Sequence, residues 1–239
     1  MKKINIFYAI ATMGFALLSC QKTEKSTAGI EPVKVELKKE STGYQLYCNG
    51  KPYFIKGAGF EGKDPSSVSK HGGNTIRTWR TGDQFITGKE ILDKAYENGL
   101  MVCLGLEIGR ERHGFDYDDS VAVLKQKEYV KSEVLKYKNH PALLAWGIGN
   151  ELNLLHTNPK VWDAVNDISL MIKELDQNHP TTTMLAGAGK EVVNMVMQRC
   201  KSLDFLSFQL YGDIVNLPRY ISESGYDGAY VVSEWGATG

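Results

Sequence analysis

The chain of 239 residues is 42% hydrophobic, and its 28 Lys and Arg residues balance 28 Asp and Glu residues to a formal net charge of +0. Nucleic-acid partners require a strongly positive surface, so this balance and the lack of a basic block argue against them. The cysteines and histidines show no Cys-x-x-Cys or His-x-x-x-His spacing, so we expect no catalytic metal and no cofactor. Beyond Cys20, the odd number of cysteines (Cys48, Cys103 and Cys200) favours buried free thiols over a disulfide framework.

Residues 1–20 have the features of an export signal. Lys2 and Lys3 precede an almost wholly apolar run at residues 4–18, which is short for a membrane-spanning helix. The segment that ends in Cys20 (Leu17-Leu18-Ser19-Cys20) resembles the lipobox of bacterial lipoproteins, in which cleavage leaves a lipid-bearing N-terminal cysteine. The alternative is a plain signal peptide with an incidental cysteine. We expect an exported lipoprotein that is anchored to the cell envelope and meets the membrane only through lipid attached to Cys20.

The rest of the chain is predicted to be a tether followed by one domain. Residues 21–43 are assigned as tether and lead-in, since residues 21–31 are polar and lack an apolar period. Residues 44–239 then have a length within the range of an α/β barrel. The domain opens with a predicted β-hairpin, which has strands at 44–48 and 53–57 around the turn-favouring pair Asn49-Gly50.

Short apolar runs then alternate with amphipathic stretches. We predict further strands at 75–79, 101–106, 143–148, 182–185, 204–208 and 230–233, and helices at 90–98, 120–137, 162–175, 192–197 and 217–221. The strands are too apolar to face water, which is typical of a parallel sheet covered by helices. An open doubly wound sheet is the rival, but Gly57-Ala58-Gly59 is a weak match to its glycine-rich loop. We therefore favour a (β/α)8 TIM barrel preceded by a short β-hairpin.

Titratable residues stand where several predicted strands end, which is where (β/α) barrels carry their functional side chains. The strand at 143–148 leads into Glu151, the last strand leads into Glu234, and the strand at 101–106 leads into Glu107. Glutamate at the end of a buried strand costs desolvation, so two of them at one opening suggest the paired carboxylates of glycoside hydrolysis. The alternative is that each Glu caps a helix or pairs with an Arg.

Four segments occur in the order found in the catalytic barrels of clan A retaining glycoside hydrolases, and they most closely resemble glycoside hydrolase family 2. They are Asn74-Thr75-Ile76-Arg77, Asn139-His140-Pro141, Trp146-Gly147-Ile148-Gly149-Asn150-Glu151 and Val232-Ser233-Glu234-Trp235-Gly236. The likeness runs roughly from Lys51 to the end of the chain. It implies a TIM barrel and a carbohydrate substrate, without indicating which sugar.

The resemblance also implies residue roles in a double displacement at a glycosidic bond, which we expect to be a β bond. Glu234 would be the nucleophile and Glu151 the general acid and base. Asn150 would bind the sugar 2-hydroxyl, Arg77 would orient Glu234, and Tyr211 would touch the nucleophile. Gln209 stands where relatives often have Asn, which leaves its role open.

Other residues are candidates for substrate contact. Trp79 and Trp235 follow strand ends, where flat rings can stack on sugar faces. Glu107 is expected to line the pocket. For the charged residues that follow it in the same loop, including Arg110 and Glu111, we expect a solvated loop instead.

Two features depart from the family. The β-sandwich domains that usually precede the barrel have no counterpart, and a full barrel takes about 250 residues, so we expect this one to be truncated after its seventh strand. The leading function is a retaining glycoside hydrolase acting on oligo- or polysaccharides. Two alternatives stay open: a non-catalytic carbohydrate-binding lipoprotein and a glucan transglycosylase.

Overall fold

The structure is a computed structural model and describes residues 31–237. The predicted signal segment, including Cys20, and most of the predicted tether lie outside the described residues.

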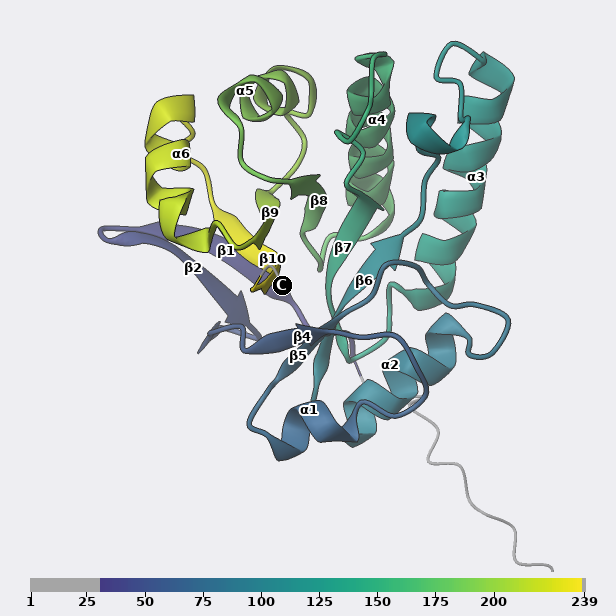
Figure 1. The fold of residues 1–239 in the computed structure, drawn as a ribbon. Helices are drawn as coiled ribbons and strands as arrows, with labels where there is room; N and C mark the ends of the chain where they lie inside the picture. Colours follow the sequence, from purple (N-terminus) through teal and green to yellow (C-terminus); the bar gives the residue numbers. More distant parts are fainter. Residues whose placement is uncertain (1–30, 238–239) are drawn as a thin grey trace, which may run out of the picture.

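Seven parallel strands form a nearly closed barrel whose neighbours follow the chain order (Figure 1). The strands are β4 (Gly57–Gly59), β5 (Thr75–Arg77), β6 (Met101–Leu106), β7 (Leu143–Asn150), β8 (Thr181–Ala186), β9 (Phe205–Tyr211) and β10 (Tyr230–Gly236). Within residues 31–237, β4 and β10 are the outer strands and do not pair with each other. The predicted TIM-barrel architecture with seven strands is confirmed.

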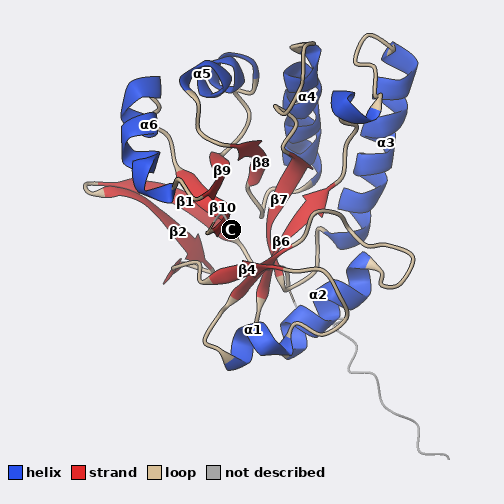
Figure 2. Cartoon of the chain, viewed as in Figure 1, coloured by secondary structure: helices blue, strands red, loops and turns tan. Residues whose placement is uncertain are grey.

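Helices surround the strands as an outer layer (Figure 2). They are α1 (Ser66–Lys70), α2 (Gly88–Glu97), α3 (Ser120–Tyr137), α4 (Lys160–Leu175), α5 (Lys190–Arg199) and α6 (Leu217–Ser224). The predicted bounds of α3 match because Asp119 caps its start, where the side chain accepts hydrogen bonds from the backbone N–H groups of Val121 and Ala122. Buried apolar side chains of the helices, such as Leu92 of α2, Val134 of α3 and Val165 of α4, share one core with the outward faces of the strands.

A three-stranded antiparallel sheet covers the amino-terminal end of the barrel. It consists of β1 (Val35–Glu40), β2 (Gly43–Cys48) and β3 (Lys51–Tyr53), so the predicted hairpin gains a first strand that we did not expect. Leu37 of β1 packs against Phe205 and Ala229, which stand at the starts of β9 and β10. The sheet therefore closes the end of the barrel opposite the one expected to be functional.

The prediction of a single strand at residues 53–57 is wrong. Its ends belong to different sheets, β3 and β4, and residues 54–56 connect them. The Asn74 side chain donates to the carbonyl of Phe54 at 2.8 Å and accepts from the backbone N–H of Lys56 at 2.8 Å. These bonds satisfy backbone groups that a continuous strand would have paired.

Other expectations concern membranes, thiols and metals. Of the helices between residues 31 and 237, none combines the length and apolar character needed to span a membrane. Cys48, Cys103 and Cys200 are free thiols; Cys200 is buried as predicted, whereas Cys48 and Cys103 are only partly buried. The described residues contain no cluster of His, Cys, Asp and Glu side chains that could hold a metal ion.

Candidate active site

The carboxyl edge of the barrel brings together the residues that the sequence places at strand ends. Arg77 ends β5, Asn150 ends β7 and is followed by Glu151, Tyr211 ends β9, and Glu234 lies in β10. Because the strands are parallel, their carboxyl ends meet at one opening.

Glu151 has an unusual backbone conformation. Its φ is +51°, in the left-handed region that costs a non-glycine residue about 1 kcal/mol or more. The preceding Gly149 also has a positive φ of +70°, and the pairing of β7 with β8 shifts register before Asn150. The Glu151 backbone N–H still donates to the carbonyl of Met184 at 2.9 Å. The chain thus turns away from the strand direction at Glu151 while it stays bonded to β8.

Glu234 also follows an irregularity in its strand. The register of β10 against β9 shifts between Val232 and Glu234, so Ser233 is the extra residue of a bulge. Glu234 then pairs with Gln209. A bulge re-aims the side chains that follow it, and here Glu234 lies next to the guanidinium of Arg77.

Arg77 links the two strands that carry the carboxylates. Its Nη1 lies 3.4 Å from Glu234 Oε2, and its Nη2 donates to Asn150 Oδ1. The guanidinium carbon also lies 4.6 Å from the centre of the Trp79 ring. Burial lowers the pKa of Arg77, and the neighbouring negative charges of Glu234 and Glu151 act in the opposite direction. Both carboxylates therefore favour the charged form of this single cation.

The hydrogen bonds of Asn150 fix the orientation of its amide. Its Oδ1 accepts from Arg77 Nη2 and from Gln209 Nε2, the latter at 2.8 Å. Two donors on Oδ1 identify that atom as the oxygen, so Nδ2 is left as a donor beside Glu151. Gln209, whose role the sequence left open, therefore holds Asn150 from β9.

Tyr211 is half-exposed at the same edge. Partial burial raises the pKa of its hydroxyl, and the carboxylates of Glu234 and then Glu151 raise it further. The phenol therefore stays protonated and remains available as a hydrogen-bond donor toward Glu234.

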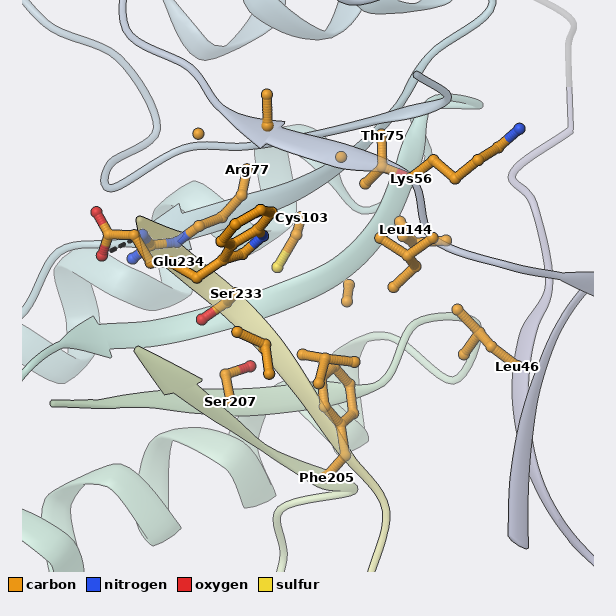
Figure 3. Close-up of a pocket in the computed structure, with 18 of the residues that line it drawn as sticks. Leu46, Lys56, Thr75, Arg77, Cys103, Leu144, Phe205, Ser207, Ser233 and Glu234 are labelled. Carbon is orange, nitrogen blue, oxygen red and sulfur yellow. Dashed lines mark hydrogen bonds and ion pairs between the residues drawn. The ribbon is translucent and has the colours of Figure 1, made fainter. Parts of the chain in front are cut away.

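A cavity of about 680 Å³ runs from this edge into the barrel. Figure 3 shows Arg77 and Glu234 toward one end of it and Leu46 toward the other. Trp79, Tyr211 and Trp235 line it as well, and Trp235 is 67% exposed. Glu107 does not line this cavity; its side chain is 49% exposed and lies 4.0 Å from Arg110.

Solved structures share this architecture. A β-D-glucuronidase from Dictyoglomus thermophilum superposes with a TM-score of 0.63 and 19% identity, over 86% of this chain and 39% of that one. A family 2 β-galacturonidase from Eisenbergiella tayi gives a TM-score of 0.60 and 18% identity, over 85% of this chain and 38% of that one. The barrel has the family 2 glycoside hydrolase fold. The predicted resemblance to the family 2 barrel is thereby confirmed.

Sequence comparison gives a shorter match. Mannan endo-1,4-β-mannosidase A from Hypocrea jecorina is 32% identical over 114 residues, which cover 41% of this chain and 25% of that protein. No family model matches the chain. The chain spans less than two fifths of the length of these two solved structures and a quarter of the mannosidase.

The loop between β6 and α3 differs from the expectation of a solvated charged loop. Arg110 and Arg112 are largely buried, with side-chain exposures of 17% and 16%. Arg110 Nε donates to the carbonyl of Asn150 at 3.1 Å, and Arg112 Nη1 donates to the carbonyl of Glu151. No local pattern marked these residues, because their partners lie about forty positions away in the chain.

Proposed function

We propose that this protein is a retaining glycoside hydrolase that cleaves β-glycosidic bonds of oligo- or polysaccharides. The observation that carries the proposal is the bridge made by Arg77, which contacts Glu234 on β10 and Asn150, the residue before Glu151, at the carboxyl edge of a family 2 fold. Two carboxylates near one cation at this edge suit a reaction that needs a nucleophile and a proton donor on the same bond.

In the first step, Glu234 attacks the anomeric carbon and the bond from that carbon to the leaving oxygen breaks. Glu151 gives its proton to the leaving oxygen, and a glycosyl ester of Glu234 forms. In the second step, Glu151 takes a proton from water as the water oxygen attacks the anomeric carbon. The ester bond breaks and the Glu234 carboxylate is restored.

The neighbouring groups fit these steps. Asn150 Nδ2 is free to donate to the sugar 2-hydroxyl, since Oδ1 already accepts from Arg77 and Gln209. Burial and then the Glu234 carboxylate raise the pKa of the Tyr211 hydroxyl, so this phenol stays available as a donor, and Trp235 offers an exposed ring at the cavity rim. Similar proteins include a β-glucuronidase, a β-galacturonidase and an endo-β-mannosidase, which supports a β-linked pyranoside as the proposed substrate class.

Hydrolysis of a panel of aryl β-glycosides (glucoside, mannoside, glucuronide and galacturonide) tests the proposal. We expect cleavage of at least one, with kcat/KM reduced at least about 10³-fold in Glu234→Gln and Glu151→Gln. Glu174→Gln, on the exposed face of α4, is the matched control and should retain wild-type activity. Equal inertness of the wild type and Glu234→Gln, with retained sugar binding, would contradict hydrolysis and favour a binding lipoprotein. Transfer to a sugar acceptor instead of water would favour a transglycosylase.

We also propose that the protein is an exported lipoprotein held at the cell envelope by lipid on Cys20. The proposal rests on the positive start, the apolar run and the lipobox-like segment of residues 1–20. Labelled palmitate should be incorporated into the wild-type protein and not into Cys20→Ser. Equal labelling, or none in either protein, would contradict a lipid at Cys20.

A further inference from the structure

The segment that follows β7 depends on donors from another loop. At Asn150 and Glu151 the chain leaves the regular ladder, and both backbone carbonyls turn toward the loop between β6 and α3. A buried carbonyl needs a donor, and here arginine side chains supply it. Arg110 Nε donates to the Asn150 carbonyl at 3.1 Å, and Arg112 Nη1 donates to the Glu151 carbonyl.

Arg112 contacts Glu151 in two ways. Besides the bond to its carbonyl, Arg112 Nη2 lies 3.9 Å from the carboxylate oxygen Oε2. One planar guanidinium therefore meets both the backbone and the side chain of the same residue. That residue is held at φ +51°, and such a conformation persists only where its surroundings determine it strongly.

The loop that carries these arginines is itself held in place at Gly109. The backbone N–H of Gly109 donates to Gln126 Oε1 of α3 at 2.5 Å, and the Tyr117 hydroxyl donates to the Gly109 carbonyl at 2.6 Å. Between the two arginines, the Glu111 carboxylate accepts from the backbone N–H groups of Thr157 and Asn158 at 2.9 and 3.1 Å. Residues 110–112 thus clamp the segment after β7 on both sides of Glu151.

The clamp brings the positive charges of Arg110 and Arg112 close together. Their repulsion is unfavourable for a loop that has only a structural role. Burial lowers the pKa of Arg112, the positive charge of Arg110 lowers it further, and only the Glu151 carboxylate opposes them. Local features that oppose stability are expected at functional sites.

We propose that Arg112 is a positioning residue for the general acid and base, and that it holds both the backbone and the carboxyl of Glu151 toward the bond to be cleaved. Arg110 supports it by holding Asn150. This inference rests on the proposed glycoside hydrolysis. It gives the loop after β6 a role in the proton transfer by Glu151, which is distinct from the role of the nucleophile Glu234 on β10.

Leaving-group dependence tests this role in the full chain. Protonation by Glu151 matters for a phenyl glycoside and little for a 2,4-dinitrophenyl glycoside, whose leaving group departs as the anion. In Arg112→Met we expect kcat for the phenyl substrate to fall about 10-fold or more with little change in KM, and the dinitrophenyl substrate to lose less than about 3-fold in the glycosylation step. Arg112→Lys keeps the charge and should recover part of the loss.

Arg199→Met is the matched control, because Arg199 pairs with Asp163 at 2.7 Å outside the barrel. It should leave the rates with both substrates unchanged. Equal losses of Arg112→Met on both substrates would overturn the positioning role while the hydrolase proposal stands.

A crystal structure of Arg112→Met gives a readout that needs no turnover. We expect Glu151 to leave the left-handed region or its carboxyl to turn away from the Arg77 side of the opening. An unchanged Glu151 would overturn the inference even if no glycoside is cleaved. Inertness of the wild type on every glycoside would count against the proposed function instead.

Discussion

Replacing Arg77 by Met should strongly reduce activity and leave the fold largely intact. Arg77 is buried, and its Nε has no hydrogen-bond partner among the described residues. Gln209 Oε1, on the other side of Asn150, is also buried without a partner within residues 31–237. Unsatisfied buried groups reduce stability, so the arrangement is better explained by function than by folding.

The magnitude follows from the two contacts of Arg77. It donates charge-assisted hydrogen bonds to Glu234 and Asn150, and a bond of this kind contributes about 1.5–3 kcal/mol. Loss of that amount in the transition state corresponds to a decrease of about 10- to 150-fold in kcat/KM. The free energy of unfolding should change by no more than about 1 kcal/mol, because Met fills similar space, removes a desolvated cation and leaves Glu234 in reach of water.

The assay compares kcat/KM on the preferred aryl β-glycoside with urea unfolding followed by tryptophan fluorescence. Arg77→Lys is the informative control, because it keeps the charge but cannot bridge Glu234 and Asn150 with a planar fork. An Arg77→Met protein with wild-type kcat/KM would refute this reasoning. The reasoning would also be refuted if Arg77→Met lost more than about 3 kcal/mol of unfolding free energy, because unfolding would then explain the lost activity.

Further predictions concern stability and binding. Asp176→Ala should lower the unfolding free energy by about 3 kcal/mol, since the buried carboxylate accepts from Trp146 Nε1 and His179 Nδ1, both at 2.8 Å. Burial raises the pKa of Asp176, but these hydrogen bonds outweigh burial and hold the pKa below its ordinary value. The contribution of Asp176 to the free energy of unfolding is therefore complete above about pH 4 and is lost as the pH falls through the folded pKa. Urea unfolding at a series of pH values should show the stability difference between the wild type and Asp176→Ala shrinking in that acidic range. Gly105→Ala should destabilise by about 1–3 kcal/mol in the same assay, because the added Cβ would lie 2.4 Å from the carbonyl of Thr78. Trp235→Ala should raise KM for oligosaccharides about 5- to 10-fold without changing the melting temperature, because its exposed ring contributes about 1 kcal/mol to sugar contact.

The elements that the sequence predicts well are those with local signals. Helix α3 shows its capping Asp119 and its amphipathic face directly in the chain. The ends of β7 and β10 stand out because a glutamate directly after an apolar run costs desolvation. The rule that strand ends meet at one edge predicts that Arg77, Glu151 and Glu234 share one opening, and in the structure Arg77 Nη1 lies 3.4 Å from Glu234 Oε2.

The elements that were missed depend on distant partners. Strand β1 alternates little and is rich in Lys and Glu, and its place is set by pairing with β2 and by Leu37 against the barrel. Arg112 looked like one more charged loop residue, since its contact with Glu151 exists only after two β/α loops pack together. The left-handed backbone of Glu151 likewise follows from bonds to β8 and to the clamp, and a sequence pattern does not reveal it.

Covalent trapping tests most directly whether Glu234 is the nucleophile of a retaining reaction. A 2-deoxy-2-fluoro β-glycoside with a dinitrophenyl leaving group slows release of the sugar more than its attachment, so the glycosyl-enzyme should accumulate. Mass spectrometry of the digested protein should find one sugar on the peptide that contains Glu234, and none in Glu234→Gln. A label on another residue, or turnover with inversion at the anomeric carbon and no label, would contradict the account.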